Sequence, residues 1–166
     1  MAFDAFLKLG DIAGASTDRA HKGEIDIGSY SFGIANTATI GSATGGAGAG
    51  KATFSDFTFT TAVSVASPKI LMACAQGSHY PTAVLSIRKA GSAGGPTTTD
   101  FLKITLSEVF VSEYQDAASL GDDVPQETVT LAYGAIKVEF TPQDPTGKPG
   151  AKVTGGWDRR SNQPVG

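Results

Sequence analysis

The sequence contains a single cysteine, Cys74, and two histidines, His21 and His79. One cysteine cannot form an internal disulfide, which is typical of a protein made in a reducing compartment. One cysteine and two separated histidines also lack the ligand spacing of a structural zinc site. Neither histidine belongs to a nucleophile motif, and both are interpreted as solvated loop residues. We therefore predict no catalytic residue, no metal site and no cofactor.

Charge is scarce: charged residues make up 17% of the sequence, against about 25% in an average soluble domain. The net charge is −3 and Lys and Arg do not cluster, so no surface for nucleic acid or for a membrane is predicted. No apolar run approaches the length that inserts into a membrane. A chain with little charge and 21 glycines is able to bury surface against copies of itself.

The N-terminal sequence MAFDAFLKLG lacks a basic region, and Asp4 interrupts its apolar residues. Alternation of apolar and polar residues from Phe3 to Leu9 predicts a first strand and not a cleaved signal peptide. The protein is therefore expected to be made and folded in the cytoplasm.

The same alternation recurs along the chain and predicts an all-β protein in a single domain, residues 1–166. In three strands the apolar residues change phase, near Gly28, Ser107 and Gly134. A one-residue slip turns the apolar set to the other face, and bends at such points would let long strands close a small β-barrel. The expected strands cover residues 3–9, 24–34, 52–63, 82–89, 100–114, 127–141 and 151–157.

One short α-helix is expected in the sequence SPKILMACAQG. Ser67 suits the N-cap, and Gly77 suits the position just after the helix. Helical spacing places Ile70, Leu71 and Cys74 on one face, which is expected to pack on the barrel. Cys74 is interpreted as a small buried hydrophobic residue, and a reactive thiol is the alternative.

The stretch GGAGAGKATF, residues 45–54, raises the question of a phosphate site, because Gly45 to Lys51 has the G-x-x-x-x-G-K spacing of a P-loop. Ala52 stands where a P-loop has the Ser or Thr that holds magnesium. The residues that follow are typical of a strand and not of a phosphate-binding helix. A flexible hairpin or edge loop is therefore favoured.

Trp157 stands near the C-terminus, in the sequence GGWDRR. Together with Arg159 and Arg160 it could act as a stacking platform. The alternative is a tryptophan that packs against the barrel or against a neighbouring subunit.

Five long stretches, in a fixed order, carry a resemblance that no single motif carries. They are MAFDAFLKLGDIAGASTDRAHKGEIDIGSYSFG, AGKATFSDFTFT, SPKILMACAQGSHYPTAVLSIRKAG, DFLKITLSEVFVS and ETVTLAYGAIKVEFTPQD. Together they resemble the haemolysin-coregulated protein (Hcp) family, the inner-tube subunit of bacterial type VI secretion systems. The resemblance spans the chain from Met1 to about Asn162.

The resemblance implies a β-barrel with one flanking helix and a homohexameric ring. Rings would stack into a tube inside a contractile sheath, with a spike protein at the tip and small effector proteins in the lumen. The subunit would leave the bacterial cytoplasm for the exterior or a target cell without a cleaved signal peptide. It would not be an enzyme. The alternative is an Hcp-like secreted effector or enzyme on the same domain, although the final DRRSNQPVG is expected to leave no room for a second domain.

The resemblance also implies roles for particular residues. Ser31 and Ser119 match positions where small polar residues of the family face the channel and govern cargo fit. Tyr30-Ser31-Phe32 stands where Trp-Ser-Trp is common in the family, and the loop around Ser119 has fewer glycines than its counterparts. The sequence GSATGGAGAGK would be the family's extended loop, which contacts neighbouring subunits or rings through Gly45, Gly46, Gly48, Gly50 and Lys51.

Overall fold

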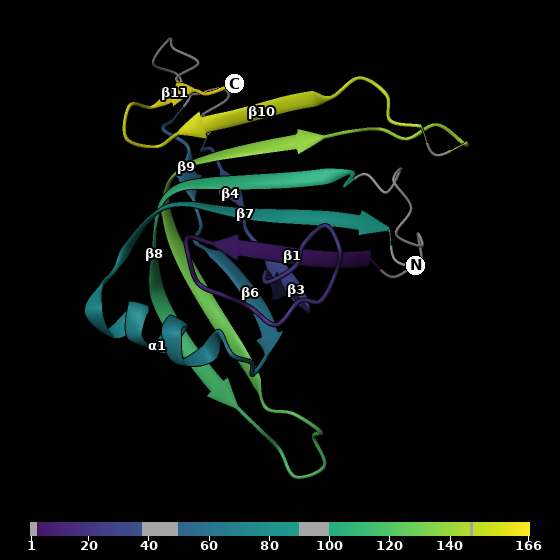
Figure 1. Cartoon of the computed structure of the whole chain (residues 1–166). Coiled ribbons are helices and arrows are strands. Elements are labelled where there is room, and N and C mark those ends of the chain that lie inside the picture. The colour runs from purple at the N-terminus through teal and green to yellow at the C-terminus, as the bar shows by residue number, and fades with distance from the viewer. Residues whose placement is uncertain (1–2, 38–49, 90–99, 147) are drawn as a thin grey trace.

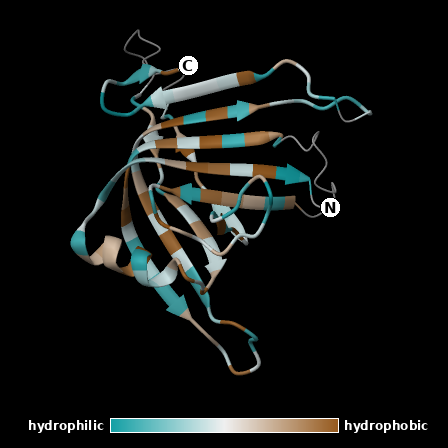
Figure 2. Cartoon of the chain, viewed as in Figure 1, coloured by the Kyte–Doolittle hydropathy of each residue, from teal (hydrophilic) through white to brown (hydrophobic). Residues whose placement is uncertain are grey.

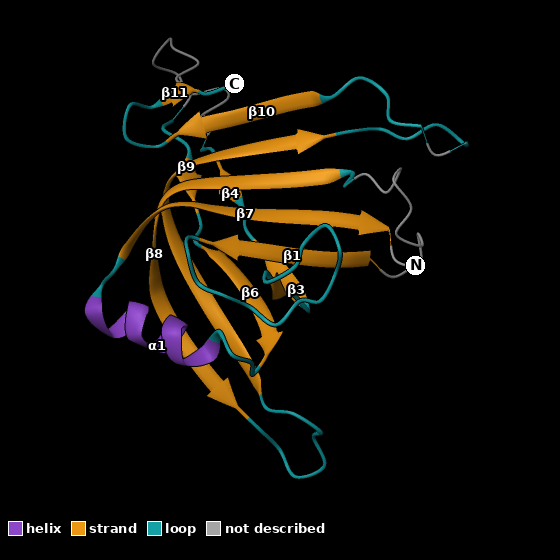
Figure 3. Ribbon diagram, viewed as in Figure 1, coloured by secondary structure: helices purple, strands orange, loops and turns teal. Residues whose placement is uncertain are grey.

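A strongly curled antiparallel sheet dominates the structure, a computed structural model that describes residues 3–37, 50–89, 100–146 and 148–166 (Figure 1). One short helix, α1 (Ser67–Gln76), packs against the sheet (Figure 3). The prediction of a β protein with one short helix is confirmed. The strands are β1 (Phe3–Leu9), β2 (Ile25–Asp26), β3 (Ser29–Ser31), β4 (Ile34–Ala35), β5 (Thr53–Phe54), β6 (Phe57–Ala62), β7 (His79–Lys89), β8 (Leu102–Ala117), β9 (Gln126–Phe140), β10 (Val153–Asp158) and β11 (Gln163–Pro164).

The main sheet has the order β11-β10-β9-β8-β7-β1-β2, and β6 pairs with both β9 and β3. β2 and β3 belong to one stretch of chain that changes neighbours where the phase slip near Gly28 was expected. The Ile27 N–H donates to the carbonyl of Ala5 (2.9 Å), and the next N–H, of Gly28, donates to the carbonyl of Thr60 (2.8 Å). Residues 25–26 pair only with β1 and residues 29–31 pair only with β6, so the described strands form a curled sheet that does not close into the small β-barrel that was expected.

The long strands β8 and β9 bend sharply and pass from one half of the curled sheet into the other (Figure 1). The bend coincides with Glu108, which has a positive φ of 50°, and with Gly134 on the neighbouring strand. A Cβ at Gly134 would lie 3.4 Å from the Cβ of Glu108, so the two strands lie close together at the bend. The buried positions of β8 run in steps of two to Leu106 and resume at Val109, as the phase slips predicted.

The core fills the inside of the curl and includes residues from both halves of the bent strands. Figure 2 shows the apolar positions as bands that alternate with polar ones along β7, β8 and β9. Burial of each large aliphatic side chain contributes about 1.5–3 kcal/mol to folding. The largest fully buried side chains are Leu7, Leu9, Ile25, Phe57, Phe59, Ile70, Leu85, Ile104, Leu106, Val109, Glu127 and Leu131.

The helix begins one residue earlier than expected. Ala66 occupies the N-cap, and Ser67, predicted as the cap, is the first helical residue. The Ser67 hydroxyl is buried and donates to the Glu127 carboxylate (3.0 Å), which explains why it does not cap the helix. Gly77 follows the helix in the left-handed conformation (φ 64°), as predicted.

The buried face of α1 differs from the predicted one. Ile70 is 0% exposed and Ala73 is also buried, whereas Leu71 is 49% exposed. The predicted burial of Leu71 was wrong because the face that meets the sheet is centred on the Ser67–Ile70–Ala73 row. Cys74 lies half-buried at the margin of this face and packs against the core.

A buried carboxylate, Glu127 of β9, ties the helix to the sheet and is 0% exposed. Ser67 donates to one of its oxygens, and the Tyr114 hydroxyl of β8 donates to the other (2.7 Å). These charge-assisted hydrogen bonds offset the cost of taking a carboxylate out of water. Burial of Tyr114 and its hydrogen bond to Glu127 raise the pKa of Tyr114 to about 12.

We expect Ile70→Ala to lower the free energy of unfolding by about 2–5 kcal/mol, because it leaves a cavity under α1. Leu71→Ala is the matched control and should change it by about 0.5 kcal/mol or less, since half of that side chain is already in water. Urea denaturation of both variants measures the difference. Equal losses in the two variants would show that the buried face of α1 is assigned wrongly.

Tyr114→Phe should flatten the fall in stability at high pH. An unfolded tyrosine loses its proton near pH 10, whereas folded Tyr114 keeps it to about pH 12. The folded state therefore binds more protons above pH 10, and the free energy of unfolding falls as the pH rises through this window. The variant should be less stable than the parent at neutral pH, and the gap should narrow above pH 10 in urea titrations. A gap that stays constant with pH would contradict this role for Tyr114.

Candidate functional site

Small hydroxyl side chains cover the outer face of β3, β6 and β9. The register places Ser29 opposite Thr60 and Thr60 opposite Thr128, and it aligns Ser31, Thr58 and Thr130 in the same way. Directly opposed residues point to one side of a sheet, so these side chains share one surface. We define the hydroxyl face as Ser29, Ser31, Thr58, Thr60, Thr128 and Thr130.

Hydroxyls of this face bond to each other. Ser29 Oγ and Thr60 Oγ1 lie 2.7 Å apart, and Thr58 Oγ1 and Thr130 Oγ1 lie 3.3 Å apart. Each such pair uses one hydroxyl proton and so reduces the donors that the surface offers to another molecule. The hydroxyl face is therefore polar and uncharged, and its side chains are short.

Ser31 lies on the hydroxyl face and is exposed, as a wall position requires. Ser119 is also exposed but lies elsewhere, in the connection from β8 to β9. Its N–H donates to the Asp122 carboxylate (2.8 Å), and its carbonyl accepts from the Asp122 N–H (3.0 Å). The channel-facing role of both serines remains a prediction.

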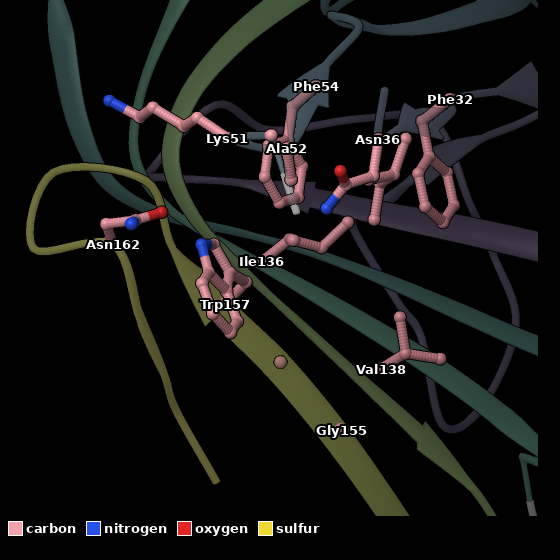
Figure 4. A pocket seen from close by; sticks show the side chains of 13 residues that line it. Phe32, Asn36, Lys51, Ala52, Phe54, Ile136, Val138, Gly155, Trp157 and Asn162 are labelled. Carbon is pink, nitrogen blue, oxygen red and sulfur yellow. The ribbon is translucent and has the colours of Figure 1, made fainter. Parts of the chain in front are cut away.

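An apolar hollow of about 540 Å³ opens between the β4–β5 pair and strands β9 and β10 (Figure 4). In Figure 4, Phe32 and Phe54 lie on one side of the hollow, and Ile136 and Trp157 lie on the other. The Tyr133 hydroxyl donates to the carbonyl of Ser55 (2.9 Å) and so holds the segment after β5 against β9. We call this site the hollow; its apolar lining is Phe32, Ile34, Phe54, Ile136, Val138 and Trp157.

Cationic side chains lie at one edge of the hollow, around an adjoining depression of about 440 Å³. Arg160 pairs with Glu108 and with Asp158. Within the described residues, neither Lys51 nor Arg159 forms an ion pair. We call Lys51, Arg159 and Arg160 the cationic rim; two of its three charges are thus available to a partner.

Aromatic rings hold the Arg159 side chain in place. Its guanidinium carbon lies 5.1 Å from the centre of the Tyr133 ring and 5.5 Å from that of Phe54. The same group donates from one terminal nitrogen to the carbonyl of Tyr133 (3.0 Å). Because these contacts restrict the side chain, its remaining N–H groups are prepositioned for an acceptor at the rim.

Two residues predicted for the extended loop lie beside the hollow. The Gly50 N–H donates to the carbonyl of Thr37 (3.1 Å), and a Cβ at this position would lie 2.6 Å from that oxygen, so the close approach requires glycine. Lys51 lines the hollow and leads into β5. A strand and not a helix therefore follows Lys51, which removes the P-loop interpretation. Gly45, Gly46 and Gly48 lie outside the described residues.

His21 is a structural residue that sequence reasoning misassigned as a solvated one, since it is 7% exposed. Its ring nitrogens lie 2.9 Å from the Glu24 carboxylate and 3.1 Å from that of Asp100, and the ring stacks on Phe6. In the sequence, the spacing of three residues between His21 and Glu24 was the feature that could have indicated a paired histidine. Asp100 is 79 residues away from His21, so the sequence gave no indication of that contact.

Neither a metal cluster nor a membrane-spanning helix occurs in the described ranges. No group of three or more His, Cys, Asp and Glu side chains there is arranged to hold a metal ion. No helix among the same residues is both long and apolar enough to cross a bilayer.

Within the part of the chain that the structure describes, these features define a β-sheet protein with one short helix and two exposed surfaces, the hydroxyl face and the hollow. The sequence matches the family model described as "Type VI secretion system effector, Hcp" over residues 6–140. It is 41% identical to protein Hcp1 of Pseudomonas aeruginosa over 163 residues, 98% of each chain. The chain belongs to this Hcp family of type VI secretion. The predicted family is confirmed, and with it the main predicted function, a type VI secretion tube subunit.

Solved structures show the same relationship. The fold is similar to a structure described as that of a type six secretion system protein, with a TM-score of 0.89, 36% identity and coverage of 99% of this chain and 100% of the other. It is also similar to the crystal structure of Hcp1 from Salmonella typhimurium, with a TM-score of 0.81, 31% identity and the same coverage. The curled sheet with one helix is therefore the fold of this family.

Trp157 offers a direct probe of the hollow, because it is the single tryptophan of the sequence and lines the hollow. We expect its fluorescence emission to move to shorter wavelength when copies associate and exclude water from the indole. Fluorescence and native mass, both recorded across one dilution series, measure the emission maximum of Trp157 and the association state together. An emission maximum that stays fixed while the native mass changes would show that association leaves the hollow open.

Proposed function

We propose that six copies of this chain form a ring whose channel is lined by the hydroxyl face, and that such rings stack into the tube. The observation that carries the proposal is the hydroxyl face itself, which continues the predicted wall position Ser31 across three strands. Its register with Thr58 and Thr130 extends the predicted wall from one residue to a surface. The family match, with 41% identity to Hcp1, supports a type VI secretion role.

The chemistry of the hydroxyl face suits a wall past which folded proteins move. A charged wall would attract or repel cargo through long-range forces, and an apolar wall would hold it by excluding water. Hydroxyls that are already bonded to one another, such as those of Ser29 and Thr60, exert no strong long-range force on cargo and do not hold it strongly by excluding water. Cargo would then be selected by size and by a few hydrogen bonds, so short side chains matter at each wall position.

The proposal includes partners outside the ring. A spike protein at the tip, a contractile sheath around the tube and small effector proteins in the lumen are the partners that the family resemblance implies. Export would proceed with the tube and would need no cleaved signal peptide. The alternative is an Hcp-like secreted effector or enzyme on the same domain.

Ser31→Gln tests the wall. The longer side chain, repeated in every copy of the ring, narrows the channel, whereas the exposed position should tolerate it without loss of folding. We expect intact rings that no longer co-purify with, or stabilise, a small effector protein of the same system. Ser119→Gln should show the same effect more weakly.

The matched control is Thr154→Gln, which lengthens an exposed hydroxyl residue of β10 that lies outside the hydroxyl face. This variant should retain the effector. Ser31→Gln rings that still retain it would remove Ser31 from the cargo surface. Loss of the ring in Ser31→Gln would place the residue between subunits instead.

A further inference from the structure

The hollow and its cationic rim form an open surface in the part of the chain that the structure describes. Its lining combines exposed aromatic and aliphatic side chains with Lys51, Arg159 and Arg160. No Asp or Glu lines the hollow or the adjoining depression. Arg160 is paired with Glu108 and Asp158. Among the described residues, Lys51 and Arg159 therefore supply the unpaired positive charge beside the apolar recess. The surface therefore suits a segment that is both apolar and acidic.

A segment of that chemistry lies at the end of the β8–β9 hairpin. Leu120 is fully exposed there, and Val124 is also exposed. Residues 112–126 contain Glu113, Asp116, Asp122 and Asp123 but no Lys, Arg or His. We call residues 120–125 the acidic tip; Ser119, which precedes it, is the residue predicted to face the channel. An aliphatic side chain flanked by carboxylates is the complement of an apolar hollow flanked by cations.

The acidic tip is held in a defined shape. The two hydrogen bonds between Ser119 and Asp122 close its turn, and Gly121 takes the positive φ of 104° that the turn requires. The β8–β9 ladder extends to the pair Ala117 and Gln126, directly below the tip. Leu120 is thus presented at the end of a paired hairpin, so little ordering is needed before it can dock.

The two surfaces lie at opposite ends of the molecule. Figure 1 shows the β8–β9 connection projecting beyond α1 at the bottom, whereas β4 and the end of β10 that carries Trp157 lie in the upper part. One copy cannot dock its own tip in its own hollow. Two copies placed head to tail can, and such a contact leaves a free tip and a free hollow for further copies.

We propose that the acidic tip of one copy docks in the hollow of a copy in the next ring, with Leu120 in the apolar recess and Asp122 or Asp123 at Lys51 and Arg159. This inference rests on the proposed function, because it assigns the contact between stacked rings. A ring would present the contact six times, so a weak pairwise contact suffices for a stable stack. Lys51 then has the stacking role that the family resemblance implied.

Charge reversal with rescue tests the contact. Leu120→Ser, Lys51→Glu and Asp123→Lys should each raise, by about tenfold or more, the ring concentration at which stacks form in sedimentation velocity. The double variant Lys51→Glu/Asp123→Lys should restore stacking to within about threefold of the parent, because the ion pair is rebuilt with reversed sign. Leu71→Ser is the control: it removes an equally apolar exposed side chain from α1 and should leave stacking unchanged.

A cysteine pair gives a second readout that does not depend on stack stability. Leu120→Cys with Ala52→Cys, in a Cys74→Ser background, should yield disulfide-linked copies when the rings are oxidised with copper phenanthroline. A chain that carries only one of these two cysteines should not form the cross-link. Normal stacking by Leu120→Ser and Lys51→Glu rings, or no cross-link in the pair, would overturn the tip contact and leave the ring proposal standing. A parent that forms no ring at all would instead overturn the proposed function.

Discussion

The bend of β8 and β9 at Glu108 and Gly134 is the constraint on which the rest of the structure depends. If β8 and β9 were straight, they could pair with strands in only one half of the sheet, and the strands of the other half would have no partners. Because both strands bend at the same point, the first half of β8 pairs with β7, the last part of β9 pairs with β10, and the first half of β9 pairs with β6, while β8 and β9 pair with each other on both sides of the bend. One core can then fill the curl, and the carboxylate of Glu127 can anchor α1 beneath it.

The bend also separates the two exposed surfaces. A single strand, β9, contributes Thr128 and Thr130 to the hydroxyl face and, beyond the bend, Ile136 and Val138 to the hollow. In a regular straight strand these four positions, separated by even numbers of residues, would all point to one face of the sheet. The curl instead directs the hydroxyls outward on one half and leaves the apolar side chains of the other half beneath β4 and β5. Both surfaces are consequences of one local irregularity in the backbone.

Sequence patterns were sufficient for the features that local periodicity controls. Alternation located the long strands, but it merged β2, β3 and β4 into one strand and β5 and β6 into another, and it gave no sign of β11. The phase slips near Gly28, Ser107 and Gly134 located the change of neighbours and the bend. The helix was found, but Leu71 was misplaced, because helical spacing defines a stripe without saying where the sheet meets it. Distributed sequence similarity identified the family, which no short motif could do.

Features made by distant residues could not be read from the sequence. The hydroxyl face is formed by the register of β3, β6 and β9. The sequence does not show which residue of a neighbouring strand lies opposite a given threonine, so this face could not be predicted. The hollow joins residues of 32–36 and 50–54 to residues of 136–138 and 155–162, so its apolar positions resembled core positions of separate strands. The closed barrel was expected because bends favour closure, whereas residues 25–31 pair with β1 and β6 in turn.

Native mass spectrometry of the purified full chain tests most directly whether these surfaces serve a ring. The account predicts a dominant species of six times the 16.9 kDa chain, about 101 kDa, at micromolar protein. A dominant 16.9 kDa monomer under the same conditions would contradict it. The hydroxyl face would then be an ordinary solvent-facing surface and not the wall of a channel.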